Sequence, residues 1–242
     1  MTLIELRSDF DVEVVQQCGD DLMIGKAAWV STGRVVSEPE PGKLKGTLEF
    51  LMKKRHGSPF EHGFITFRIN APIFLWREFH RHRIGFSYNE ESGRYMKLKP
   101  VFYAPGEARG SNMLKAEDFK PSKPGFRGML ACDDTTRKAD NRGLRGIYQD
   151  AYDLYEQRLA AGYDNGLARI DLPVALYSAC YVSCNPRSLM NLLELRTDEE
   201  SAAERSHPLW EFHVLAKTIE EKFSEFWPIT YKLWNDNGRK AP

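Results

Sequence analysis

The chain has few cysteines, no net charge and no long apolar run, and each absence excludes a class of protein. Four cysteines among 242 residues are far too few for a disulfide-rich secreted domain. Lysine plus arginine number 34, and so do aspartate plus glutamate, so the net charge is zero. A protein that coats nucleic acid without sequence preference needs excess positive charge. No stretch approaches the ~20 apolar residues of a membrane span, and Asp9 and Asp11 interrupt any signal segment. We therefore expect a cytoplasmic protein with no nucleic-acid partner and no membrane partner.

Common cofactor and metal motifs are also missing. There is no Gly-x-Gly-x-x-Gly and no Walker loop, so a nucleotide cofactor would be bound without the usual glycine turn. His-Glu-x-x-His and Cys-x-x-Cys are absent too. The sequence predicts no metal site, although a metal hydrolase stays a rival hypothesis because histidines cluster at His56, His62, His80 and His82. Cys180 and Cys184 have apolar neighbours, which favours inert buried thiols over a redox pair.

Hydrophobic spacing predicts both strands and helices. Ile65, Phe67 and Ile69 alternate with polar residues, which predicts a strand over residues 64–70. Apolar residues at helical spacing predict helices over 43–54, 144–161, 188–196 and 209–226, and another from about 21 to 30. Pro72 suits the first turn of a helix over 72–82. For the helix over 144–161 the expected buried residues are Ile147, Ala151, Leu154, Tyr155 and Leu159.

The order of these elements predicts an α+β fold. We expect a central, mostly antiparallel sheet flanked by long helices. No internal repeat or break in composition divides the chain, so residues 1–242 are predicted to form a single domain. Residues 104–144 are rich in glycine, proline, lysine and aspartate and are predicted to be a surface insertion.

One segment, residues 81–95, has the composition of a binding site. It holds three arginines, one histidine, two glutamates and two serines within fifteen residues, directly after an apolar segment. Guanidinium forks beside small hydroxyls suit planar anions, either a phosphate or the imide edge of a pyrimidine. The alternatives are a solvated basic face and a nucleic-acid-binding module, and the zero net charge weighs against the second.

Two further sets of polar residues accompany this segment. Arg187 and Asn191 are four residues apart and share a helix face, whereas Arg196 points about 140° away. This helix is therefore either an ordinary amphipathic helix or one that presents one face to one ligand and its far end to another. Arg169 lies among apolar residues and needs an anionic partner, either a ligand phosphate or a distant carboxylate.

Taken in order, these motifs resemble the flavin-dependent thymidylate synthase family (thymidylate synthase-complementing protein). The resemblance begins with Arg81-His82-Arg83 followed by Ser87, Asn89, Glu90, Ser92, Gly93, Arg94 and Tyr95. It continues in His56-x-Ser58-Pro59-Phe60-Glu61-His62, Ala71-Pro72-Ile73-Phe74, Ala168-Arg169-x-x-Leu172-Pro173 and Asn185-x-Arg187-Ser188-Leu189-Met190-Asn191 with Arg196. Only residues 104–144 and the last few residues lack a clear counterpart.

The resemblance implies an activity. Members of the family are homotetrameric FAD-dependent methyltransferases, and their active sites form where subunits meet. It converts dUMP to dTMP with 5,10-methylenetetrahydrofolate as the one-carbon donor and NADPH-reduced FAD as the hydride donor, as a step of dTMP biosynthesis. It uses no cysteine nucleophile, which agrees with cysteines predicted to be buried.

The resemblance also implies roles for residues. The implied FAD contacts are Ser31, His56, Ser58, Arg81, His82, Arg83, Glu90, Asn185, Arg187 and Asn191. The implied dUMP contacts are Glu78, Ser92, Gly93, Arg94, Arg169 and Arg196, of which Ser92 and Arg196 are the expected catalytic residues.

Two departures from the family pattern stand out. Eight residues rather than seven separate Arg83 from Ser92, so the region around Gly85 must carry an extra residue. Glu78 replaces a glutamine found in many members, and its carboxylate needs a cationic neighbour beside a phosphate.

Overall fold

The computed structural model describes residues 2–34, 39–40, 42–110 and 134–242, and within them the α+β prediction is confirmed. A four-stranded antiparallel sheet has the order β2-β3-β6-β4. Its strands are β2 (Asp11–Cys18), β3 (Phe64–Pro72), β6 (Tyr177–Cys184) and β4 (Phe86–Glu90). A separate parallel pair joins β1 (Glu5–Arg7) to β5 (Val101–Tyr103), with Leu6 opposite Phe102. The predicted strand over 64–70 is β3.

Contacts divide the chain into two units, and each unit draws on segments that are far apart in sequence. Unit 1 comprises Met1–Phe10, Asn70–Glu78 and Glu90–Ala179. Unit 2 comprises Asp11–Ile69, Phe79–Asn89 and Cys180–Pro242. The single domain over residues 1–242 stays a prediction.

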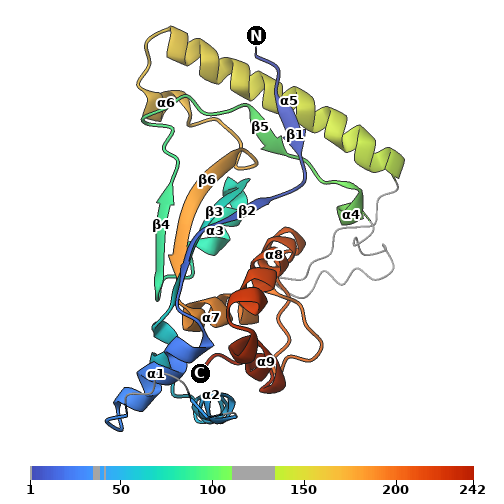
Figure 1. The fold of residues 1–242 in the computed structure, drawn as a ribbon. Helices are drawn as coiled ribbons and strands as arrows, with labels where there is room; N and C mark the ends of the chain where they lie inside the picture. Colours follow the sequence, from blue (N-terminus) through green and yellow to red (C-terminus); the bar gives the residue numbers. More distant parts are fainter. Residues whose placement is uncertain (1, 35–38, 41, 111–133) are drawn as a thin grey trace. The chain divides into compact units, whose positions relative to one another are not determined.

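The core of unit 1 forms between the parallel strand pair and a long helix, α5 (Asp134–Ala160), that runs along it (Figure 1). Three tyrosines of α5, Tyr148, Tyr152 and Tyr155, are buried against Phe102 and its neighbours. Leu98 is held by two of them: its amide donates to the hydroxyl of Tyr155 (3.0 Å), and its carbonyl accepts from Tyr152 (2.8 Å). Buried tyrosines keep their hydroxyls bonded in this way, so their large rings can fill the core.

The predicted buried face of this helix is partly wrong. Tyr155 is buried as expected, but Ile147 is 62% exposed and Leu154 is 39% exposed. The tyrosine rings bury more area than these aliphatic side chains, and they determine which face of α5 points inward. The helix also begins at Asp134 rather than near 144, inside the predicted insertion over 104–144. The short helix α4 (Glu107–Gly110) lies in the same range, and residues 111–133 lie outside the described residues.

Unit 2 is mainly helical around its part of the sheet. Its helices are α1 (Asp21–Val30), α2 (Lys43–Lys53), the 3₁₀ turn η1 (Ser58–Glu61), α7 (Pro186–Arg196), α8 (Trp210–Phe226) and α9 (Pro228–Asp236). The predictions over 21–30, 43–54, 188–196 and 209–226 correspond to α1, α2, α7 and α8. The buried Asp21 at the start of α1 accepts from the amides of Ile229 (2.8 Å) and Thr230 (2.9 Å) and from the Thr230 hydroxyl (2.6 Å). One carboxylate thereby joins two helices.

The predicted helix over 72–82 is shorter in the structure. Helix α3 (Ile73–Phe79) begins after Pro72, which belongs to β3, and ends three residues early. The Tyr88 hydroxyl lies within hydrogen-bond distance of the carbonyls of Phe79 (3.0 Å) and His82 (2.6 Å), so a side chain meets the last helical carbonyl. A helix that finds such a partner for its terminal carbonyl can end there.

Candidate active site

In unit 1, a turn directly after β4 holds three of the predicted nucleotide contacts, Ser92, Gly93 and Arg94. The Ser92 side chain accepts from the amide of Arg94 (3.3 Å), which shapes the turn. Gly93 is buried, and a Cβ there would lie 3.0 Å from Cδ of Arg169 and 2.8 Å from Leu98. The glycine therefore lets the Arg169 stem pack against the turn, and the structure brings all four predicted residues together.

Arg169 follows the short helix α6 (Asn165–Ala168), which is anchored at its start. Asp164 caps its start by accepting from the amide of Gly166 (2.8 Å), and Asn165 donates to the carbonyl of Arg94 (3.1 Å). Asp171 pairs with Arg158 instead. Among the described residues, no carboxylate lies within ion-pair distance of Arg169, so a ligand anion is the better of its two predicted partners.

The remaining predicted residues of unit 1 are carboxylates. Glu78 lies near the end of α3 and Glu90 is the last residue of β4, and both are half-buried. In the next position, Glu91 has its amide bonded to the carbonyl of Ala179 (2.8 Å). The backbone after β4 is thus fixed before the turn begins.

In unit 2, the start of α7 is packed against the loop that carries the Arg-His-Arg motif. The Asn185 side chain accepts from the amide of Ser188 (2.8 Å), and the Ser188 hydroxyl donates to the carbonyl of Ile84 (2.8 Å). Gly85 has a φ of 70°, and a Cβ there would overlap the Ser188 hydroxyl and lie 2.8 Å from the Asn185 amide nitrogen. Only glycine fits this turn without strain, because a side chain disfavours positive φ and would collide.

Arg187 is held on three sides in the same unit. Its guanidinium pairs with Glu61 (2.7 Å) and donates to the carbonyl of Pro242 (2.7 Å). A Cβ at Gly57 would overlap that side chain, so the glycine leaves the path that Arg187 follows. Asn191 donates to the Arg187 carbonyl (3.1 Å), one turn along the helix.

A cavity of about 500 Å³ lies beside the start of α7 within unit 2. Its lining residues are mostly small or polar: Cys18, Glu61, His62, Gly63, Phe64, Gly85, Ser87, Ser183, Cys184 and Asn185. Of the predicted cofactor residues only Asn185 lines it. Ser183 also lines the cavity and was not predicted as a site residue. Glu61 and His62 line it too; both belong to a family motif, but the sequence predicted no role for them.

At the other end of α7, Arg196 contacts an aromatic ring and a neutral histidine. Its Nε donates to Nε2 of His82 (3.1 Å), and its Cζ lies 4.9 Å from the centre of the Phe212 ring. Burial, together with the Arg196 charge, lowers the pKa of His82 to about 4. His82 is therefore neutral near pH 7 and can accept this hydrogen bond. Arg187 and Arg196 contact separate residues, as their predicted helical phases require.

The other predicted cofactor residues are exposed, and the structure does not bring them together. Arg81 and Arg83 are exposed in the loop before β4, and Ser58 is exposed at the start of η1. The His56 ring packs edge-on against Phe50, with centroids 5.6 Å apart. Ser31 ends α1 and donates to the carbonyl of Ala28 (2.8 Å).

The metal-hydrolase hypothesis finds no geometric support among the described residues. Among the described residues there is no group of three or more histidine, cysteine, aspartate or glutamate side chains placed to hold a metal ion. The predicted burial of Cys180 and Cys184 is confirmed, and burial raises the pKa of the Cys184 thiol. In the part of the chain that the structure describes, no helix has the length and apolarity needed to cross a membrane.

Comparisons with known proteins agree with the sequence motifs. The family model "Thymidylate synthase complementing protein" matches residues 13–229. The flavin-dependent thymidylate synthase of Streptomyces avermitilis is 44% identical over 241 residues, covering 98% of this chain and 95% of that one. That of Tropheryma whipplei is 41% identical over 241 residues, covering 97% and 96%. The crystal structure of the UMP/dUMP methylase PolB from Streptomyces cacaoi, bound with 5-Br UMP, has a TM-score of 0.88 at 36% identity and covers both chains fully.

Proposed function

Because this chain belongs to the flavin-dependent thymidylate synthase family, we propose that it converts dUMP to dTMP in dTMP biosynthesis. The one-carbon unit comes from 5,10-methylenetetrahydrofolate, and the reducing equivalents come from NADPH through FAD. Most support comes from one observation: Arg169 packs against the Ser92–Arg94 turn, and no described carboxylate neutralises it.

The turn has the chemistry of a phosphate site. The Ser92 hydroxyl and the guanidinium groups of Arg94 and Arg169 are donors of the kind that bind a phosphate dianion. Arg94 is exposed, and its guanidinium lies over the Tyr95 ring (5.7 Å), which limits its rotamers. We assign these groups to the 5′-phosphate of the nucleotide, with Gly93 as the point of close backbone approach. Glu78 and Glu90 are assigned to the nucleotide and to FAD on the family pattern alone.

Arg196 is assigned to the pyrimidine ring. A fixed positive charge at a carbonyl edge stabilises negative charge that develops on the ring oxygens as C5 attacks the methylene carbon. Neutral His82 accepts a hydrogen bond from Arg196 Nε. This bond orients the guanidinium, whose other N–H groups are directed away from His82. Since the new methyl group replaces the C5 hydrogen, that hydrogen must leave as a proton.

The chain's residues in unit 2 fit a flavin dinucleotide. Its diphosphate needs cations, and Arg81, Arg83 and Arg187 offer them, while Asn185 and Asn191 add neutral donors and acceptors. His56, Ser58, His82 and Ser31 are assigned to the same cofactor on the family pattern. The cavity beside Asn185 provides room against small side chains. When bound, FAD supplies the hydride that completes the methyl group.

Self-association as a homotetramer belongs to the same proposal. Beside Arg169, three apolar side chains are exposed: Leu167 at 57%, Ile170 at 66% and Val174 at 46%. Large apolar side chains exposed close together in sequence are a feature of contact surfaces between protein chains. Light scattering should give a mass four times that of the 27.8 kDa chain.

Methylation of UMP is a second candidate, because PolB is a UMP/dUMP methylase and its structure with 5-Br dUMP has a TM-score of 0.87 to this chain. The curated relatives that carry the thymidylate synthase name favour dUMP. Parallel assays with dUMP and UMP, both tritiated at C5, separate the two candidates.

The test is tritium release from labelled dUMP in the presence of NADPH and the folate, with protein that is yellow when purified. Arg196→Ala should abolish dTMP formation and spare flavin uptake, whereas Arg187→Ala should weaken flavin retention. A colourless protein that takes up no added FAD contradicts the proposal. So does turnover that both substitutions leave intact.

A further inference from the structure

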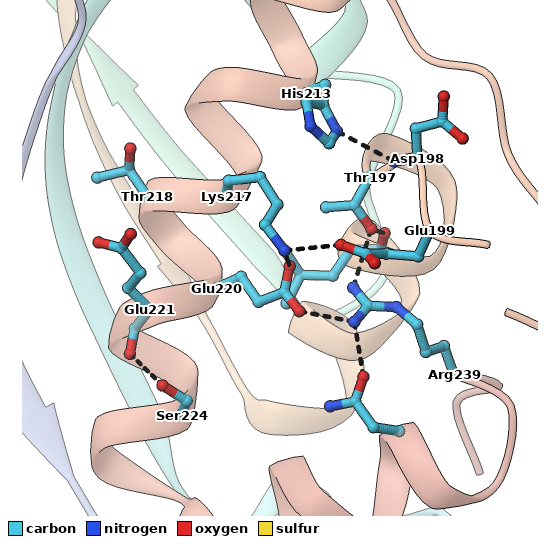
Figure 2. A network of polar contacts seen from close by, with 12 residues as sticks. Thr197, Asp198, Glu199, His213, Lys217, Thr218, Glu220, Glu221, Ser224 and Arg239 are labelled. Atoms are coloured by element: carbon cyan, nitrogen blue, oxygen red, sulfur yellow. Dashed lines mark hydrogen bonds and ion pairs between the residues drawn. The ribbon is translucent and has the colours of Figure 1, made fainter. Parts of the chain in front are cut away.

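The three residues directly after Arg196 each bond to a network of polar and charged side chains in unit 2, whose centre is buried (Figure 2). Thr197 ends helix α7 and is only 2% exposed. Its hydroxyl donates to the carbonyl of Leu193 (2.6 Å) and accepts from Nη2 of Arg239 (2.9 Å). The next amide, that of Asp198, donates to Nδ1 of His213 (3.0 Å). The end of α7 is therefore fixed from outside the helix.

Arg239 is the centre of this network. It is 2% exposed, and its guanidinium donates to Glu220 (2.7 Å) and Asn235 (2.7 Å) and lies 4.1 Å from the Trp234 ring centre. Its φ is 60°, an uncommon backbone conformation for a residue with a side chain. A strained backbone that carries a buried charge persists only where surrounding contacts impose it. These contacts hold one guanidinium in one orientation, with one arm on the end of α7.

Glu220 supplies the counter-charge. It is 2% exposed on α8, and Lys217 and Tyr231 reach its carboxylate at 2.9 Å and 3.0 Å. Burial alone would raise the pKa of Glu220, but the hydrogen bond and charge of Arg239 bring it below its ordinary value. Lys217 also bonds to Glu199 (2.7 Å), the third residue after Arg196. Figure 2 shows that these side chains converge on the same short segment.

Helix α8 contacts both sides of this arrangement. Phe212, whose ring lies beneath the Arg196 guanidinium, and Glu220, which holds Arg239, are buried residues of that helix. Arg196 thus has its tip on Phe212, while the backbone that carries it is tied to Arg239. A shift of the helix end would move the guanidinium relative to its ring and to His82.

We propose that Thr197 and Arg239 are positioning residues for Arg196, and that Glu220 holds Arg239 in place for this role. The inference rests on the proposed function only where it is tested by turnover. A displacement of about 1 Å in a catalytic group can cost about 10²-fold in rate. Loss of the Thr197–Arg239 bond should therefore lower kcat much more than it lowers flavin content.

The test compares substitutions matched in size. Thr197→Val removes the hydroxyl and keeps the shape, whereas Thr197→Ser keeps the hydroxyl. Thr218→Val is the matched control, because the Thr218 hydroxyl also bonds to the carbonyl four residues before it (3.3 Å) but does not contact Arg239. Arg239→Lys is a second variant that keeps the charge beside Glu220 and lacks the second arm of the fork.

Tritium release per flavin-loaded protein should fall about tenfold or more in Thr197→Val and Arg239→Lys. It should stay within about twofold of the original protein in Thr197→Ser and Thr218→Val. In an Arg196→Ala background, Thr197→Val should cause no further loss of dUMP binding. Undiminished kcat in Thr197→Val, or in Arg239→Lys where Thr197→Val does not fold, overturns the inference.

A geometric measurement separates failure of this inference from failure of the proposed function. If the unaltered protein turns over neither dUMP nor UMP, the function is refuted, but crystal structures of Thr197→Val and Arg239→Lys still decide the positioning role. Arg196 should leave hydrogen-bond distance of His82 in both variants. An Arg196 that keeps its contacts with His82 and Phe212 in both overturns the inference.

Discussion

The contact between Arg196 and His82 predicts how stability depends on pH. His82 has an ordinary pKa of 6.5, which burial and the Arg196 charge lower to about 4. The unfolded chain therefore binds a proton on His82 at a pH where the folded chain does not. The contribution of neutral His82 to the free energy of unfolding is fully present above pH 6.5 and is lost as the pH falls from there toward 4.

The size of the effect follows from the pKa shift. One pKa unit corresponds to about 1.4 kcal/mol, so a shift from 6.5 to about 4 sets a ceiling of about 3 kcal/mol on the free energy of unfolding. At pH 5 the folded protein should have lost about 2 kcal/mol of this. Since His82 is only partly buried, these figures are upper values.

Urea unfolding at pH 7.5, 6 and 5 measures it, with His82→Gln as the comparison. Glutamine does not titrate, and its amide oxygen can still accept from Arg196. The stability difference between the two proteins should change in this direction by at most about 2 kcal/mol across this range, because solvent reaches part of the His82 ring and screens the effect. If His82→Gln loses stability on acidification in parallel with the original protein, the neutral-acceptor assignment is wrong.

Three other substitutions test the described packing. Gly85→Ala should cost about 2 kcal/mol or more and lower Tm, because a positive φ and a collision with Ser188 both oppose it; an unchanged Tm contradicts that geometry. Asp21→Ala should cost about 3 kcal/mol in urea unfolding, through lost bonds to Thr230 and its neighbour, and equal stability contradicts it. Tyr152→Phe should cost about 1 kcal/mol by the same assay, since it frees a buried carbonyl, and a stabilised protein contradicts it.

Sequence patterns predicted the elements whose periodicity is simple. The alternation of Ile65, Phe67 and Ile69 predicted β3, and leucines at helical spacing predicted α7. Strand β6 was not predicted, because its first residues, Tyr177 to Cys180, are all buried and show no alternation. Strand β4 was not predicted either, because its composition is mainly polar, although Phe86 and Tyr88 alternate with exposed residues.

The candidate site was predictable to a similar degree. Motif order identified Ser92, Arg94 and Arg169 as one group, and the structure brings them together. The network on Arg239 was not predictable, because it joins residues that are distant in sequence and belong to no motif. No pattern in the sequence predicts that Arg239 is buried or that its φ is positive.

The order of strands in the four-stranded sheet affects how the chain folds while the ribosome is still synthesising it. Strand β6 lies between β3 and β4, yet it is translated long after both. Until Cys184 has left the exit tunnel, the nascent chain carries a hydrophobic β3 with one unpaired edge. Such an edge is open to chaperones and to neighbouring nascent chains alike, so yield during expression should depend on how quickly translation delivers the missing strand.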